Sequence, residues 1–181
     1  MKKVVSILLA LAMTLTLTCV AFADAPAVEE VNVEYDESYV QVSLGEECFT
    51  FIPADWTTVE PAADAAESVN LLGAFTNADK TISLGVAATT FETAATYESI
   101  YDETVKAGLT ASLQSINGTE FACMAATNET GATIVYTYLI NPEGTEAYVF
   151  SFFVAASAME GAETILNQIM ASFGYFEAGE Q

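Results

Sequence analysis

The chain has 181 residues, among them 25 Asp or Glu, four Lys or Arg and no His, so its formal net charge is −21. A chain this acidic cannot hold DNA or RNA phosphates by counterion release, which excludes nucleic acid as a partner. The absence of His excludes an imidazole base, an imidazole metal ligand and a Ser-His-Asp triad. Because 52% of the residues are hydrophobic, the chain has enough apolar material to bury a core and is not a disordered acidic tail.

Residues 1–23 have the pattern of a secretory signal peptide. Lys2 and Lys3 precede an apolar run over residues 4–20, and Ala21-Phe22-Ala23 is a small-x-small cleavage box. The alternatives are an uncleaved membrane anchor and a lipoprotein that carries its lipid on Cys19. We expect cleavage after Ala23 and a secreted, extracellular protein that has no membrane association once the signal is removed.

Residues 24–37 are acidic and contain Pro26, which indicates a solvated leader or spacer outside the fold. The acids of this segment are Asp24, Glu29, Glu30, Glu34, Asp36 and Glu37. The remaining length suits one domain with a sizeable core, which we expect over residues 38–175, followed by a tail over residues 176–181.

The domain is expected to open with a β-hairpin. Residues 39–44 alternate apolar and polar side chains, which is the period of a strand that is buried on one face. A turn at residues 45–47 leads into a second strand over residues 48–52, which Pro53 ends.

A second hairpin is predicted over residues 69–75 and 81–89, with its turn at residues 77–80. The period then changes and predicts an amphipathic helix over residues 93–106, with Thr93 as N-cap and Gly108 as the stop signal. Its predicted apolar stripe consists of Ala94, Tyr97, Tyr101 and Val105.

Four more strands follow, separated by turn sequences, over residues 113–116, 120–127, 133–140 and 146–154. The first turn, Asn117-Gly118, is a strong two-residue hairpin signal. A final helix is predicted over residues 157–173, with a capping box of Ser157 and Glu160 and an end at Gly174. Its predicted stripe consists of Met159, Ala162, Leu166, Ile169 and Phe173.

The predicted order is therefore two hairpins, a helix, four strands and a helix. Hairpin connections imply a mainly antiparallel β-sheet, and two amphipathic helices must bury their stripes on it. The fold class is α+β.

Three stretches in this order resemble one known family. They are Phe-Thr-Phe-Ile-Pro-Ala-Asp-Trp at residues 49–56, Ile-Asn-Gly at 116–118, and Ala-Tyr-Val-Phe-Ser-Phe at 147–152 with the helix end at 169–173. They are similar to the opening aromatic strand, the central turn, and the closing strand and helix of the PsbP-like superfamily, which includes small secreted bacterial proteins. The resemblance covers residues 38–175 and implies the fold, but no particular activity.

Cys48 and Cys123 are the only cysteines after the signal segment. Secretion permits a disulfide between them, and two small buried thiols are the alternative. Two isolated cysteines without His do not indicate a metal site, and the chain has no EF-hand loop, so no metal or other cofactor is expected.

Trp56 is the single tryptophan, and it is either part of the core or an exposed ring that binds a partner or a sugar. Glu98, Asp102 and Glu103 share the first predicted helix and are either a solvated face or an acid–base pair for glycoside cleavage.

We therefore expect a secreted, acidic, non-enzymatic binding or accessory module for an extracellular protein or glycan. Two alternatives stay open: an extracellular hydrolase that uses two carboxylates, and a structural or assembly component of the cell envelope. The first alternative needs two acids that face each other across a cleft. The second needs an unpaired sheet edge or an oligomer.

Overall fold

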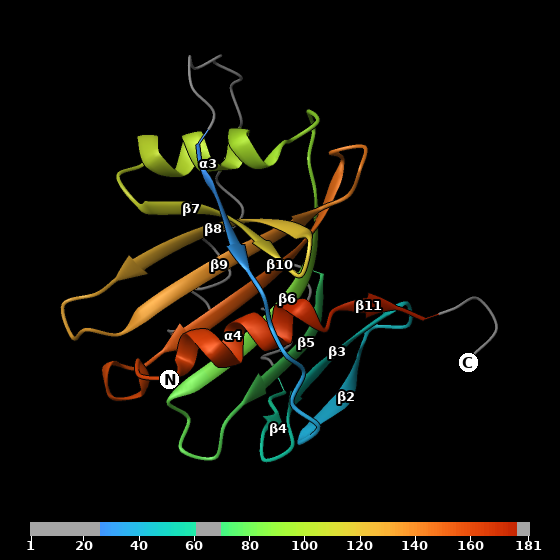
Figure 1. Ribbon diagram of the computed structural model, residues 1–181, viewed down its shortest axis with the longest axis vertical. Helices are drawn as coiled ribbons and strands as arrows, with labels where there is room; N and C mark the ends of the chain where they lie inside the picture. Colours follow the sequence, from blue (N-terminus) through green and yellow to red (C-terminus); the bar gives the residue numbers. More distant parts are fainter. Residues whose placement is uncertain (1–25, 61–69, 177–181) are drawn as a thin grey trace.

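The computed structural model describes residues 26–60 and 70–176, and Figure 1 shows their arrangement. The predicted signal peptide, its cleavage site at Ala23 and almost all of the predicted tail lie outside the described residues. No helix in the described ranges combines the length and the hydropathy that are needed to cross a lipid bilayer.

An eight-stranded sheet forms the centre of the molecule, in the order β1-β7-β8-β9-β10-β6-β5-β4. Its strands are β1 (Val28–Val31), β4 (Thr57–Thr58), β5 (Leu71–Thr76), β6 (Ile82–Thr90), β7 (Thr110–Ile116), β8 (Thr119–Thr127), β9 (Thr133–Ile140) and β10 (Glu146–Val154). Neighbouring strands are antiparallel except for the β1–β7 pair, which is parallel. The prediction of an α+β fold with a mainly antiparallel sheet is confirmed.

A second, three-stranded sheet has the order β11-β3-β2. It consists of β2 (Tyr39–Leu44), β3 (Cys48–Pro53) and β11 (Gly174–Tyr175). The predicted first hairpin is therefore present as β2 and β3, and the chain returns after the last helix to add β11 beside it.

The large sheet is covered on both faces, by the helices α3 (Tyr97–Lys106) and α4 (Ala162–Ala171). Successive residues of β8 belong to different clusters: Phe121 and Cys123 to the one that includes α4 and the small sheet, Ala122 and Met124 to the one that includes α3. This alternation is the strand period of two, which divides the core into two layers.

Helix α3 begins later than the sequence predicts. Thr96, and not Thr93, is the N-cap: its Oγ1 accepts from the Ser99 N–H at 3.1 Å, and Ser99 Oγ accepts from the Thr96 N–H at 2.9 Å. The preceding segment is held to the β9–β10 turn, where the Ala95 N–H donates to the Gly144 carbonyl at 2.8 Å. This tertiary contact keeps the chain extended beyond Thr93, so the buried face contains Ile100 and Thr104 while Ala94 and Val105 are exposed.

Helix α4 also begins later than predicted. A short 3₁₀ turn, η1 (Ala156–Ala158), takes the place of the predicted capping box at Ser157 and Glu160, and Met159 is 46% exposed. The N-cap is Gly161 with φ of 80°, a left-handed conformation that separates η1 from α4 and favours glycine. The helix ends at Ala171, whereas Gly174, the predicted stop, lies in β11.

The acidic segment before Ser38 is the largest departure from the prediction. Val28–Val31 form strand β1 and pair with Leu113–Ile116 of β7, so this part of the expected leader belongs to the sheet. Figure 1 shows the segment continuing past α4 towards β2. We refer to residues 26–37 as the N-terminal segment.

Candidate functional site

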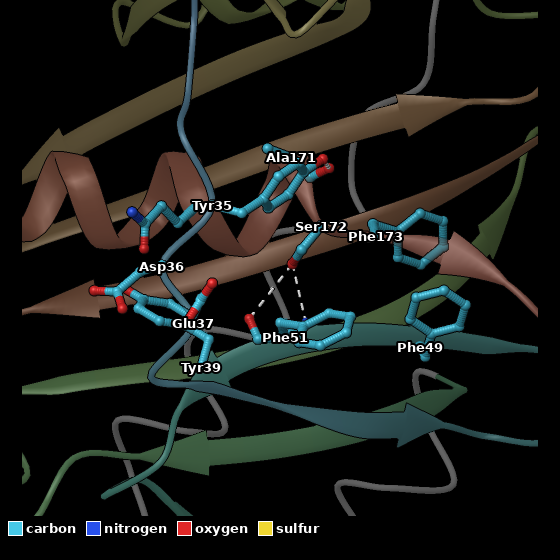
Figure 2. Close-up of a pocket in the computed structure, with 10 residues that line it drawn as sticks. Tyr35, Asp36, Glu37, Tyr39, Phe49, Phe51, Ala171, Ser172 and Phe173 are labelled. Carbon is cyan, nitrogen blue, oxygen red and sulfur yellow. Dashed lines mark hydrogen bonds between the residues drawn. The ribbon is translucent and has the colours of Figure 1, made fainter.

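A cavity of about 660 Å³ lies between the N-terminal segment, the end of α4 and the outer face of β3. Figure 2 shows aromatic rings around it and two carboxylates beside them. Its lining consists of Tyr35, Asp36, Glu37, Tyr39, Phe49, Phe51, Gln168, Ala171, Ser172 and Phe173. We call it the aromatic cavity. Its volume lies within the range of about 300–1,000 Å³ that is typical of ligand sites.

Hydrogen bonds hold the N-terminal segment in place as one wall of the cavity. Tyr35 Oη donates to the carbonyl of Ala171 at 2.8 Å, and Gln168 Nε2 donates to the carbonyl of Glu34 at 3.2 Å. Asn117 binds the backbone of Val33 twice: Oδ1 accepts from its N–H at 2.8 Å and Nδ2 donates to its carbonyl at 3.1 Å. The wall therefore depends on both α4 and the β7–β8 turn.

Strand β3 supplies the aromatic floor. Cys48, Thr50 and Ile52 point into the core, so Phe49 and Phe51 alternate with them and point outward, where their rings lie 6.1 Å apart in an edge-on arrangement. Gly174 is paired with Phe49 across the small sheet, and a Cβ atom at Gly174 would lie 2.6 Å from the Phe49 ring. The ring position therefore requires a glycine at this place in β11.

A buried group of hydroxyls joins the floor to α4. Thr50 Oγ1 donates to the carbonyl of Ile169 at 2.7 Å and lies 3.0 Å from Ser172 Oγ. Ser172 Oγ accepts from the N–H of Phe51 at 3.0 Å, as Figure 2 shows. Since Thr50 is fully buried and Ser172 nearly so, these bonds set the distance between the helix end and the strand.

The cavity is negatively charged on one side. Asp36 Oδ1 accepts from the N–H of Ser38 at 2.8 Å, and hydrogen bonds from Ser38 lower the pKa of Asp36, so this carboxylate is ionised at neutral pH. Burial, with the charges of Asp36 and Asp55, raises the pKa of Tyr39, which stays a neutral phenol. Glu37 adds a second carboxylate, and none of the lining residues is a Lys.

The chemistry of this lining suits a positively charged group. Aromatic faces attract cations, and ionised carboxylates next to them add to that attraction. Within the described ranges there is no group of three or more His, Cys, Asp or Glu side chains that is arranged to hold a metal ion.

Trp56 does not line the aromatic cavity. Its side chain belongs to the core cluster on the α4 side of the sheet, and the residue is only 8% exposed. The structure therefore places it as a core residue, the first of its two sequence interpretations.

The two cysteines are free buried thiols. Cys48 Sγ donates to Tyr148 Oη at 3.2 Å, and Cys123 Sγ donates to Gln114 Oε1 at 3.4 Å, so each thiol has its own partner. Burial raises the pKa of the Cys123 thiol to about 11, which leaves it protonated at neutral pH.

The carboxylates of the first predicted helix lie on α3, and none of them lines the aromatic cavity. Glu98 is exposed, and Glu103 forms an ion pair with Lys106 at 3.3 Å. The structure therefore brings Glu98, Asp102 and Glu103 onto a helix surface, away from this site.

Sequence reasoning missed Tyr35, Asp36 and Glu37, because it assigned them to a spacer. A weak signal was present: Val31, Val33 and Tyr35 recur at every second position within the acidic run, which is the period of a strand.

No protein-family model matches the chain, and neither does any curated protein sequence. Among solved structures, the cyanobacterial PsbP (CyanoP) of Synechocystis sp. PCC 6803 is similar with a TM-score of 0.53 and 11% identity, over 88% of this chain and 98% of that chain. The chain has the PsbP-like fold. The resemblance in the sequence is confirmed at the level of fold.

Two further solved structures are similar to the chain with lower TM-scores. LpqN, which is involved in cell envelope biogenesis of Mycobacterium tuberculosis, has a TM-score of 0.49 and 11% identity, over 77% of this chain and 92% of that chain. The Saccharomyces cerevisiae Ran-binding protein Mog1p has a TM-score of 0.46 and 13% identity, over 76% of this chain and 96% of that chain. At such identities the PsbP-like fold carries no function with it.

Proposed function

We propose that the protein is an extracellular, non-enzymatic binding module, and that its aromatic cavity takes a basic side chain of a protein partner. The predicted signal peptide at residues 1–23 supports the extracellular location. The shape and the lining of the cavity support binding as the function.

The observation that carries this proposal is the lining itself: five aromatic rings and two carboxylates around one cavity, without a cation among them. A Lys or Arg side chain would find aromatic faces for its charge and apolar surface for its stem. The formal net charge of −21 also attracts cationic partners over longer distances.

The test compares cationic peptides with neutral copies of themselves. An array of short Lys- and Arg-containing peptides is probed together with matched peptides that carry acetyl-lysine or citrulline instead. We expect binding to the cationic members only, with weaker binding as salt is added, because the charges are screened.

The variant Tyr35→Ala removes one wall of the cavity. Tyr35 is 64% exposed, so its truncation removes little core packing, and we expect the affinity for the cationic peptide to fall about tenfold. Tyr175→Ala is the matched control, because Tyr175 is 59% exposed and does not line this cavity. The affinities are measured by calorimetry.

Equal binding of the neutral peptides, or an unchanged affinity of the Tyr35→Ala variant, would overturn the proposal. Binding to a glycan array that is lost in Tyr35→Ala would assign the cavity to a carbohydrate partner instead.

A further inference from the structure

Strand β2 is an unprotected edge of the small sheet. The described residues contain four edge strands, β1 and β4 in the large sheet and β11 and β2 in the small one. Proteins shorten or charge such strands, because their unpaired N–H and C=O groups pair readily with other chains. Strands β4 and β11 have two residues each, and β1 contains two glutamates. In contrast, β2 has six residues, and none of them is charged or a proline.

The hydrogen bonds of β3 show which backbone groups of β2 point away from the sheet. The N–H of Phe51 donates to Ser172 Oγ at 3.0 Å, and its carbonyl lies 3.5 Å from the same oxygen, so both groups face α4. Gln41 is the partner of Phe51 across the hairpin, and the two therefore form a non-hydrogen-bonded pair. It follows that the N–H and C=O of Gln41, and those of Ser43 two positions on, point to the free edge.

Backbone pairing on this side of β2 begins only after its last residue. The N–H of Gly45 donates to the carbonyl of Leu72 in β5 at 3.3 Å. Among the described residues, Gln41 and Ser43 take part in no backbone hydrogen bond outside the β2–β3 hairpin. Figure 1 shows β2 at the margin of the molecule. The free edge thus extends over residues 39–43, which is roughly 17 Å at the usual rise of a strand.

The two faces of β2 present different surfaces to an added strand. Tyr39 lines the aromatic cavity, and Gln41 lies on the same face because side chains alternate along a strand. On the opposite face, Val42 and Leu44 pack in the core, but Val40 is 44% exposed. A strand beside β2 would therefore place alternate residues next to the cavity and cover Val40 with the others.

Charge distinguishes a second copy of the chain from another protein as the source of this strand. Asp36 and Glu37 precede β2, and Glu47 follows it. Antiparallel pairing of two β2 strands would bring these acids of one copy beside the acids of the other, which is destabilising. A segment that carries Lys or Arg is attracted by the same carboxylates.

We propose that the β2 edge binds an extended segment of a protein partner, which joins the small sheet as an additional strand. The segment carries basic residues on the face of the aromatic cavity and apolar residues on the face of Val40. This inference rests on the proposed function, because one of these basic residues is the one that the cavity takes. It adds that the protein recognises the main chain of its partner as well as a side chain.

The first test uses the capped heptapeptide Lys-Val-Thr-Val-Thr-Val-Lys, whose lysines and threonines share one face of a strand. One copy is N-methylated on both threonines and another on two valines. Because alternate residues of a strand direct their N–H groups to opposite edges, only one of these copies loses its bonds to β2. We expect that copy to bind at least tenfold more weakly in calorimetry and the other to bind as well as the unmethylated peptide.

The second test removes a donor from the protein. Gln41→Pro deletes one N–H of the free edge, and proline is tolerated in an edge strand where the N–H faces solvent. We expect the peptide affinity to fall at least tenfold. Gln41→Ala is the matched control, since it keeps the N–H and should leave the affinity unchanged. Circular dichroism checks the fold, and if Gln41→Pro fails to fold, the methylated peptides decide the question.

The outcomes separate this inference from the proposed function. If the heptapeptide binds, its acetyl-lysine copy does not, and the two methylated copies have equal affinities, strand addition is overturned and the proposed function stands. If no cationic peptide binds, both are overturned. A dimer that is seen in sedimentation without peptide and is lost in Gln41→Pro would assign the edge to a second copy and overturn this inference.

Discussion

Two hydroxyl groups that are equally inaccessible to water differ in their partners. Thr50 Oγ1 donates to the carbonyl of Ile169 and joins β3 to α4. Tyr138, which is 3% exposed, has no hydrogen-bond partner for its Oη among the residues that the structure describes. Removing the first hydroxyl would break a bond between elements, whereas removing the second would remove an unpaired polar group from the core.

Tyr138→Phe is therefore expected to leave the fold intact and to raise the free energy of unfolding by about 1 kcal/mol at neutral pH. The reason is that burial of the unpaired hydroxyl has a desolvation penalty, which is absent when phenylalanine is buried instead. Denaturant unfolding, followed by circular dichroism, measures the change. Thr50→Val is the opposite control and is expected to destabilise by about 1–2 kcal/mol, since it removes a buried hydroxyl that is bonded to both the Ile169 carbonyl and Ser172 Oγ.

The stability of the Tyr138→Phe variant relative to the unmodified chain is also expected to depend on pH. Burial raises the pKa of Tyr138 above its ordinary value and that of Tyr136 to about 12. A raised folded-state pKa contributes stability below the unfolded value of about 10, and this stability is lost as the pH rises through the folded value. The free energy of unfolding should thus begin to fall above about pH 10, and it should fall less steeply in Tyr138→Phe. An identical alkaline transition in both proteins would contradict this assignment.

At the scale of elements, the N-terminal segment is held in place by residues that are distant from it in the sequence. Strand β1 is an edge strand that pairs with β7 only, and the residues after it are held by Asn117, Gln168 and Ala171. Asn117 has a double role, because it also occupies the β7–β8 turn with φ of 49°. The position of the N-terminal segment, and with it the shape of the aromatic cavity, therefore depends on one turn residue, Asn117.

Asn117→Gly tests this coupling, because glycine accepts the positive φ of the turn but cannot bind Val33. We expect amide hydrogen exchange in residues 28–35 to speed up about tenfold, while β8 and β9 stay protected. Cationic peptides should bind more weakly as well. Asn128→Gly is the control, because it alters a different turn. In the β8–β9 turn, Asn128 Oδ1 accepts from the N–H groups of Thr130 and Ala132, and these bonds do not involve the N-terminal segment.

Over the whole molecule, negative charge opposes compactness. The formal net charge is −21, and the described ranges contain two cations, Lys80 and Lys106, of which Lys106 is paired with Glu103. Repulsion between like charges raises the free energy of the folded state relative to the expanded one, and salt screens it.

We expect the melting temperature to rise when roughly 0.1–0.2 M NaCl is added, where the Debye length falls to about 8–10 Å. A triple variant with Glu98→Gln, Glu129→Gln and Glu143→Gln removes three exposed charges and should show a smaller rise. Differential scanning calorimetry measures both proteins. A melting temperature that falls with salt would show that specific ion pairs outweigh the general repulsion.

What the sequence by itself determined is the part of this protein that depends on neighbours along the chain. The strands from β7 to β10 and their turns follow from a period of two and from turn residues such as Asn117 and Gly118, which act over a few positions. Their order was enough to predict the α+β class and the resemblance to the PsbP-like fold.

The tertiary structure alone decided the rest, since it depends on residues that are far apart in sequence. The start of α3 is set by the contact of Ala95 with Gly144, and β1 becomes a strand because β7 offers it a free edge. The aromatic cavity is made from an N-terminal segment, an early strand and the last helix. The local sequence around Asp36 and Glu37 predicts a solvated spacer. Only the packing of Tyr35 against α4 places these two acids at the edge of the aromatic cavity.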